Sequence, residues 1–278
     1  MKKITLFTLT SFIILFTQSS CRKVYDYIHD HPDGHESLCR ITQIRVLDYA
    51  GVRDTFDITY NAQGDPVTML GTSPYHVYSN VEQYFRYDHF GRLSVWLWTY
   101  INSEGVLVWH KYGYPRSNFV TDTVFDYTGT VDGPAPNAVD APFSYTITGY
   151  TMDDHGRIAK VWSVPNDPQE PPQLAAIIPY DANGNVIRPN PDLIYDNKVN
   201  AYRTNKVWQF VYGDYSRNNV LRNDGSFTPL YNDFGLPLNI QNFSAYPYFL
   251  TPPFFANNAG PQLDLTYACA APKGPINY

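Results

Sequence analysis

Short runs of alternating apolar and polar residues recur along this chain from residue 39 onward. In Gln83–Trp96, the clearest example, an aromatic run is followed by a tight polar turn and a second apolar run. A period of two is typical of a β-strand with one buried face. The pattern predicts strands at Cys39–Val46, Thr55–Tyr60, Val67–Leu70, Val81–Tyr87, Leu93–Tyr100, Val106–Tyr114, Phe119–Tyr127, Phe143–Thr151 and Arg157–Val164.

A turn motif recurs between these runs. An aromatic residue is followed by Asp or Asn and, four positions after the aromatic residue, by Gly. The acid or amide side chain accepts a backbone hydrogen bond, and Gly adopts the positive φ that closes a short hairpin with a bulge. The aromatic residue and the apolar residue after the turn should then face each other across the hairpin. The copies start at Tyr60, Tyr87, Tyr114, Met152, Tyr180 and Tyr231, and the turn positions are Gly64, Gly91, Asn118, Gly156, Gly184 and Gly235.

The motif resembles the tyrosine-aspartate (YD) repeat, the Y-D-x-x-G-x-L hairpin of RHS-type bacterial shells. It is more similar still to Gram-negative bacterial lipoproteins that carry a few such repeats. The resemblance covers about residues 39 to 240, with departures at Pro66, Pro115, Met152 and Pro237. It implies an all-β fold, and it supplies no catalytic residues.

The fold class expected is all-β, an antiparallel meander of these hairpins forming one large twisted sheet. Such a sheet must bury one face, so we expect it to be closed on itself or covered by the C-terminal segment. The aromatic and proline-rich run Phe243–Phe255 suits a cover, and its rings also suit stacking on sugars. Thr128–Pro142 and Pro165–Pro172 are predicted loops, and we interpret the first as an insertion within one sheet. Any helix should be short and lie within Leu193–Asn219.

The N-terminus predicts export. Two lysines precede the apolar run Ile4–Phe16, and small residues then lead to Cys21, which is the pattern of a signal peptide. The cysteine resembles that of a lipobox, although Gln18 occupies the usual leucine position. We expect residues 1–20 to be removed and Cys21 to carry palmitate and other lipid, anchoring the chain to the bacterial envelope at the outer membrane. Soluble secretion is the alternative. Residues 21–38 read as a flexible tether, and residues 39–278 as a single domain.

Composition narrows the range of partners. The chain has 24 Tyr, 16 Phe and 17% charged residues, which suits a sheet-rich exported protein. Removing the signal peptide takes away two lysines and no acid, so the formal net charge changes from −6 to −8. That balance argues against nucleic acid as a partner. The expected partners are the membrane, through the lipid, and a glycan or an envelope protein.

Two further cysteines, Cys39 and Cys269, flank the predicted domain. In an oxidising compartment they are suited to form a disulfide. The alternative is a pair of separate buried thiols.

Polar residues gather in the predicted crossover Leu193–Asn219. They either bind a sugar or peptide or satisfy the backbone of their own loop; they are Asp196, Asn200, Arg203, Asp214 and Arg217. Three histidines and two aspartates lie in His29–His35, but their spacing matches no ordered metal site. We therefore expect no metal and no cofactor.

No motif of a known catalytic or metal-binding class is present. His89 and His155 fall in turns, and His76 and His110 have no sequence partner for a dyad. The turn that starts at Asp181 resembles a calcium loop but lacks its downstream glutamate. The sequence thus favours a non-catalytic binding or structural module at the cell envelope, with its ligand and oligomeric state open. An envelope polysaccharide hydrolase using a pair of carboxylates is the alternative, and a fragment of a toxin shell is a third hypothesis.

Overall fold

The computed structural model describes residues 39–47, 53–71, 82–100, 106–128, 144–167, 169–188, 191–241 and 262–269. These ranges hold fourteen strands, one α-helix and one 3-10 helix. No helix within them is long and apolar enough to cross a membrane. The elements are β1 (Cys39–Leu47), β2 (Arg53–Tyr60), β3 (Pro66–Gly71), β4 (Glu82–Tyr87), β5 (Leu93–Tyr100), β6 (Val106–Arg116), β7 (Phe119–Thr128), β8 (Ser144–Met152), β9 (Ile158–Val164), β10 (Gln173–Ile177), β11 (Leu193–Val199), η2 (Ala201–Thr204), α2 (Lys206–Tyr212), β12 (Asn218–Arg222), β13 (Asn239–Gln241) and β14 (Gln262–Cys269).

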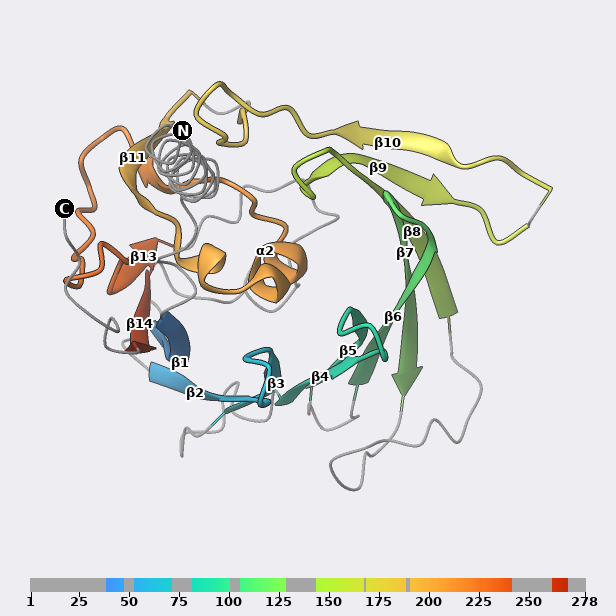
Figure 1. Ribbon diagram of the computed structural model, residues 1–278, viewed down its shortest axis with the longest axis horizontal. Coiled ribbons are helices and arrows are strands. Elements are labelled where there is room, and N and C mark those ends of the chain that lie inside the picture. The colour runs from blue at the N-terminus through green and yellow to red at the C-terminus, as the bar shows by residue number, and fades with distance from the viewer. Residues whose placement is uncertain are drawn as a thin grey trace, which may run out of the picture.

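Twelve of the strands form one open antiparallel sheet in the order β10-β9-β8-β7-β6-β5-β4-β3-β2-β1-β14-β13. From β1 to β10 each strand pairs with the next along the chain, which confirms the predicted all-β meander. β7 and β8 also pair directly, so Thr128–Pro142 is an insertion within one sheet, as predicted. The sheet curves round a central space, with β9 and β10 at one end and β13 and β14 at the other (Figure 1).

The sheet is not closed, and α2 lies inside its curve (Figure 1). Both helices fall within Leu193–Asn219, as predicted. The face toward α2, called here the concave face, carries Phe56, Met69, Phe85 and Trp96, which form one core cluster with residues of α2. Trp208 of α2 is 1% exposed, and its ring meets that of Phe85 edge to face at 5.5 Å. The described cover of the sheet is therefore the crossover helix, and Phe243–Phe255 lies outside the described residues.

Five of the six turn copies have the geometry that the motif predicts. In the copy starting at Tyr87, the Oδ1 atom of Asp88 accepts from the backbone N–H groups of Phe90 and Arg92, both at 2.9 Å. Gly91 has φ 73° and donates its N–H to the Asp88 carbonyl. The other four predicted glycines also have positive φ, namely Gly64, Gly156, Gly184 and Gly235. The flanking residues pair across each hairpin, as Tyr87 does with Leu93.

The copy starting at Tyr114 departs from this pattern. β6 runs on through Pro115 to Arg116, which pairs with Phe119 across a turn at Ser117 and Asn118. Pro115 offers no side-chain oxygen to accept the backbone bonds that hold the other turns. The strand register also shifts between Gly113 and Arg116, where a proline is tolerated. The expected equivalence of Asn118 with the turn glycines is therefore wrong, and this hairpin is tighter.

The motif tyrosines connect one hairpin to the hairpin before it. The hydroxyl of Tyr87 donates to the Pro66 carbonyl at 2.6 Å, and that of Tyr114 to the Leu93 carbonyl at 2.7 Å. In each case the acceptor is the residue that follows the preceding turn. Tyr180 repeats the bond to Ile158 at 3.0 Å, whereas the copy at Met152 has no hydroxyl to offer. We call these bonds the tyrosine ladder. They give the recurring tyrosine a role in joining neighbouring hairpins, in addition to its place in its own hairpin.

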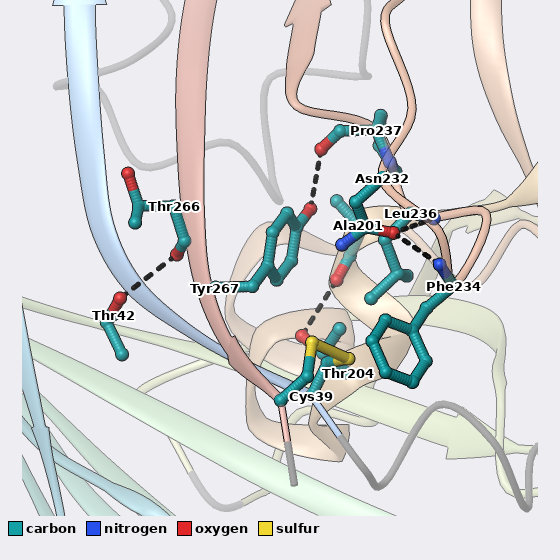
Figure 2. The surroundings of a disulfide bond; sticks show 11 residues. Cys39, Thr42, Ala201, Thr204, Asn232, Phe234, Leu236, Pro237, Thr266 and Tyr267 are labelled. Atoms are coloured by element: carbon teal, nitrogen blue, oxygen red, sulfur yellow. Dashed lines mark hydrogen bonds between the residues drawn. A yellow bond between two sulfur atoms is a disulfide. The ribbon is translucent and has the colours of Figure 1, made fainter. Parts of the chain in front are cut away.

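A disulfide joins Cys39 to Cys269, which confirms the predicted pairing and excludes two separate thiols. The two cysteines lie directly opposite each other where β1 pairs with β14. Figure 2 shows the bridge beside Thr204 of η2 and near the turn that carries Phe234. The bond connects the first and last described strands, which are 230 residues apart in sequence.

Candidate functional site

A cavity of about 310 Å³ lies between α2 and the concave face of the sheet. Leu93, Val120 and Met152 line it from the sheet, and Val207 and Phe210 line it from the helix. Phe210 packs against both hydrophobic clusters of the protein, one centred on β1–β5 and the other on β7–β9. The cavity thus lies beside α2, where the two hydrophobic clusters meet. We call it the α2 pocket.

Local structure fixes both walls of the α2 pocket. On one side, Asn205 caps α2: its side chain accepts from the Val207 N–H at 2.8 Å and donates to the Gly64 carbonyl at 3.0 Å. These bonds tie the start of the helix to the turn of the first motif copy. On the other side, the turns after β4 and β8 position Arg92 and His155 at the rim.

Arg92 is held in place by its own turn. Its Nε and Nη2 atoms lie 2.8 and 2.7 Å from Oδ2 of Asp88. Loss of hydration acts to raise the pKa of Asp88, but hydrogen bonds from the backbone and side chain of Arg92 lower it overall. The guanidinium also lies 4.1 Å above the ring of Tyr114, a cation–π contact. Burial raises the pKa of Tyr114 to about 12 although Arg92 opposes the shift, so this phenol stays neutral.

The lining of the α2 pocket, as far as the described residues form it, combines an apolar floor with a basic rim. Tyr114, Phe210 and Tyr215 supply aromatic surface, and Arg92, His155 and Lys206 supply positive or titratable groups. None of the described lining residues is Asp or Glu. Apolar walls with a few placed polar groups are the usual make-up of a small-ligand site.

A second arrangement, buried between strands, escaped the sequence analysis. The Nδ1 atom of His110 lies 2.9 Å from Oδ2 of Asp122, and Trp96 stacks on the imidazole at 4.5 Å between ring centroids. Asp122 is 4% exposed, so this pair belongs to the interior. The signal that would have revealed it is hairpin register: β6 pairs with β7 so that His110 faces Val124, which places Asp122 one step along the same face.

Of the five polar residues proposed from the crossover, the structure joins the side chains of Asn200 and Asp214 directly. Asn200 donates to Asp214 at 3.2 Å, and Asn200 and Asp214 are both buried. Asp196 accepts from the backbone N–H groups of Lys198 at 2.9 Å and Asn219 at 3.0 Å. Most of these hydrogen bonds therefore stabilise the crossover itself.

The remaining two residues contact Asn200 through the backbone: the Arg203 N–H donates to the Asn200 carbonyl at 3.0 Å, and the Arg217 carbonyl accepts from the Asn200 N–H at 2.9 Å. Arg203 is part of η2. The Arg217 side chain is exposed, while its backbone N–H donates to the Gly184 carbonyl at 3.3 Å. Arg188, which sequence reasoning did not single out, is buried and has Nη2 at 3.5 Å from Oδ2 of Asp214. The five residues therefore do not form one exposed polar surface.

The other sequence candidates are placed as follows. Asp181 accepts from the N–H groups of Asn183 and Asn185 at 2.9 and 2.8 Å, so it serves a hairpin turn. His89 is exposed, and its ring lies tilted by 43° against that of Phe90. Among the described residues no group of three or more His, Cys, Asp or Glu is placed to hold a metal. Cys21, His29–His35 and His76 lie outside the described residues.

No protein-family model and no curated protein matches this chain.

Proposed function

We propose that this chain is a non-catalytic lipoprotein of the cell envelope that binds a ligand in the α2 pocket. The observation that carries the proposal is the pocket itself, about 310 Å³ with apolar walls and a rim of basic side chains. Its frame is suited to binding because the cap of α2 and the bonds of the turn that carries Arg92 hold the walls before any ligand arrives. Preorganisation of this kind lowers the entropic cost of binding.

The proposed location in the envelope has two supports. The sequence of residues 1–21 has the layout of a lipoprotein signal. The bond between Cys39 and Cys269 is of a kind that forms and persists in oxidising compartments such as the periplasm.

Binding is tested by screening the mature protein against glycans, peptides and small organic acids, with the shift in melting temperature as readout. The Gln209→Trp variant places a large ring in the pocket from α2 and should abolish the shift caused by a true ligand. Gln63→Trp, at an exposed turn position, is the matched control and should leave the shift intact. A screen with no ligand of any class, or one whose ligands bind both variants equally, contradicts the proposal.

The anchor is tested by labelling cells that express the full chain with a palmitate analogue. Label should appear on the wild-type protein and be absent from Cys21→Ser. An unlabelled wild-type protein recovered in the soluble exported fraction would instead support secretion without an anchor.

The pocket does not favour the alternative of a polysaccharide hydrolase. A hydrolase of that kind needs two carboxyl groups about 5 to 9.5 Å apart across the cleft. The described lining supplies no carboxylate.

A further inference from the structure

We infer that the α2 pocket binds an apolar group that carries a carboxylate, such as an aryl or branched acyl acid. This inference rests on the proposed binding function and specifies its ligand class. Two sources share this chemistry: a free carboxylic acid and the C-terminal apolar residue of a peptide.

The charge of the rim is the first argument. Arg92, His155 and Lys206 border the pocket, whereas the whole chain has a formal net charge of −6. Because Asp88 balances the charge of Arg92, Lys206 supplies the formal positive charge at the mouth of the pocket, where it attracts anions.

Lys206 and Arg92 at the rim also have hydrogen-bond donors that a ligand could use. Lys206 is exposed and makes no ion pair with any other described residue. Asp88 occupies Nε and Nη2 of Arg92, which leaves Nη1 with no hydrogen bond to the described part of the chain. A carboxylate at the mouth would accept charge-assisted hydrogen bonds from both side chains.

The floor of the pocket argues for an apolar body. Val120, Val207 and Tyr215 are each no more than 5% exposed, and Phe210 and Met152 complete the apolar wall. Burial raises the pKa of Tyr215 well above its ordinary value, so its phenol adds no charge to the floor. The volume of about 310 Å³ lies at the small end of ligand pockets, which suits one ring or one branched chain better than an oligosaccharide.

The orientation follows from these two features. The apolar body enters between α2 and the sheet, and the carboxylate stays at the mouth beside Lys206 and Arg92. Because the rim is partly hydrated, the basic groups chiefly select the charge of the ligand, while the floor supplies most of the affinity.

The test uses matched acids and amides on the mature protein, with titration calorimetry as readout. The probes are 3-phenylpropionate and 3-phenylpropionamide for the free acid, and N-acetyl-glycyl-phenylalanine and its C-terminal amide for the peptide end. Each acid that fits should bind about tenfold more tightly than its amide. Binding of the peptide acid alone identifies the peptide as the source, and binding of the free acid alone identifies the small molecule.

The variant Lys206→Met should lower the affinity for the acid about three- to tenfold and leave that for the amide unchanged. Lys198→Met, at another exposed lysine, is the control and should change neither. Both variants replace exposed side chains, and their melting curves check that the fold is intact. Acid and amide of equal affinity overturn the inference. Failure of all four probes, while other ligands bind in a manner sensitive to Gln209→Trp, overturns this inference and leaves the binding function standing.

Discussion

At the scale of single residues, the turn carboxylates stabilise the hairpins through defined bonds. Asp153 accepts from the backbone N–H groups of His155 and Arg157, each at 2.9 Å, and its other oxygen accepts from Nε of Arg157. Asn61 and Asn232 fill the same position in other copies and accept from the backbone in the same way. The backbone bonds therefore need an oxygen at this position, whereas the bond to arginine gains from a charge.

We therefore expect Asp153→Ala to lower the free energy of unfolding by about 1–2 kcal/mol, because two backbone donors lose their acceptor. Asp153→Asn should recover part of that loss. Urea denaturation of both variants measures the difference, and Asp154→Ala, at the neighbouring exposed acid, is the control. A loss as large for Asp154→Ala as for Asp153→Ala would contradict this role for the turn.

The same residue makes the stability depend on pH. Partial burial acts to raise the pKa of Asp153, but hydrogen bonds from the side chain and backbone of Arg157 lower it below its ordinary value of 3.8. A carboxyl whose folded pKa is depressed contributes stability above its unfolded pKa and loses it as the pH falls through the folded value. The advantage of wild type over Asp153→Asn should therefore be full at neutral pH and shrink as the solution is acidified below about pH 4.

The tyrosine ladder gives a second prediction at this scale. Tyr87→Phe removes the hydroxyl that donates to the Pro66 carbonyl and should lower the free energy of unfolding by about 1 kcal/mol. Tyr145 is 41% exposed, so Tyr145→Phe is the matched control and should cost little. Denaturant titration of both variants measures the two losses of unfolding free energy. Equal small losses would mean that the bond between hairpins does not stabilise the protein.

At the scale of elements, α2 gives the open sheet its buried face. Seven residues are too few for a stable isolated helix, so α2 depends on its cap at Asn205 and on the docking of Trp208 among the residues of the concave face. The pocket beside it exists because such a short helix covers only part of a strongly curved surface.

Trp208→Ala should accordingly lower the free energy of unfolding by about 3–5 kcal/mol, the usual cost of removing a large aromatic ring from a core. Lys206→Ala, on the same helix but exposed, should cost less than about 0.5 kcal/mol. Thermal and urea unfolding measure both, and a mild effect of Trp208→Ala would show that the helix is not needed to cover the sheet.

At the scale of the whole molecule, the disulfide closes nearly the entire described chain into one loop. Cross-linking residues 230 positions apart restricts the unfolded chain strongly. The double variant Cys39→Ser and Cys269→Ser should therefore lose up to about 5 kcal/mol, seen as a lower melting temperature. A reducing agent should lower the wild-type melting temperature likewise and leave the double variant unchanged. Equal melting temperatures for oxidised and reduced wild type would contradict a stabilising bridge.

The sequence alone determined the hairpins, because a turn depends on residues within about four positions of one another. An acid or amide followed by glycine holds the same geometry at Asp88 and Asp153, and the copy at Tyr114, where Pro115 replaces the acid, is the one that the motif predicted wrongly. The all-β meander and the short helices also followed from local pattern, whereas the sequence left the pairing of Cys39 with Cys269 as one of two alternatives.

Tertiary structure decided the rest. Local sequence patterns do not show how far the sheet curves. They therefore did not reveal that α2 lies inside the curve beside a pocket rimmed by Arg92 and Lys206. The contact of His110 with Asp122 depends on a strand register set by an irregular turn, and the bond from Tyr87 to Pro66 joins separate hairpins. These contacts arise when elements pack together, and packing depends on shape and register summed over the whole sheet.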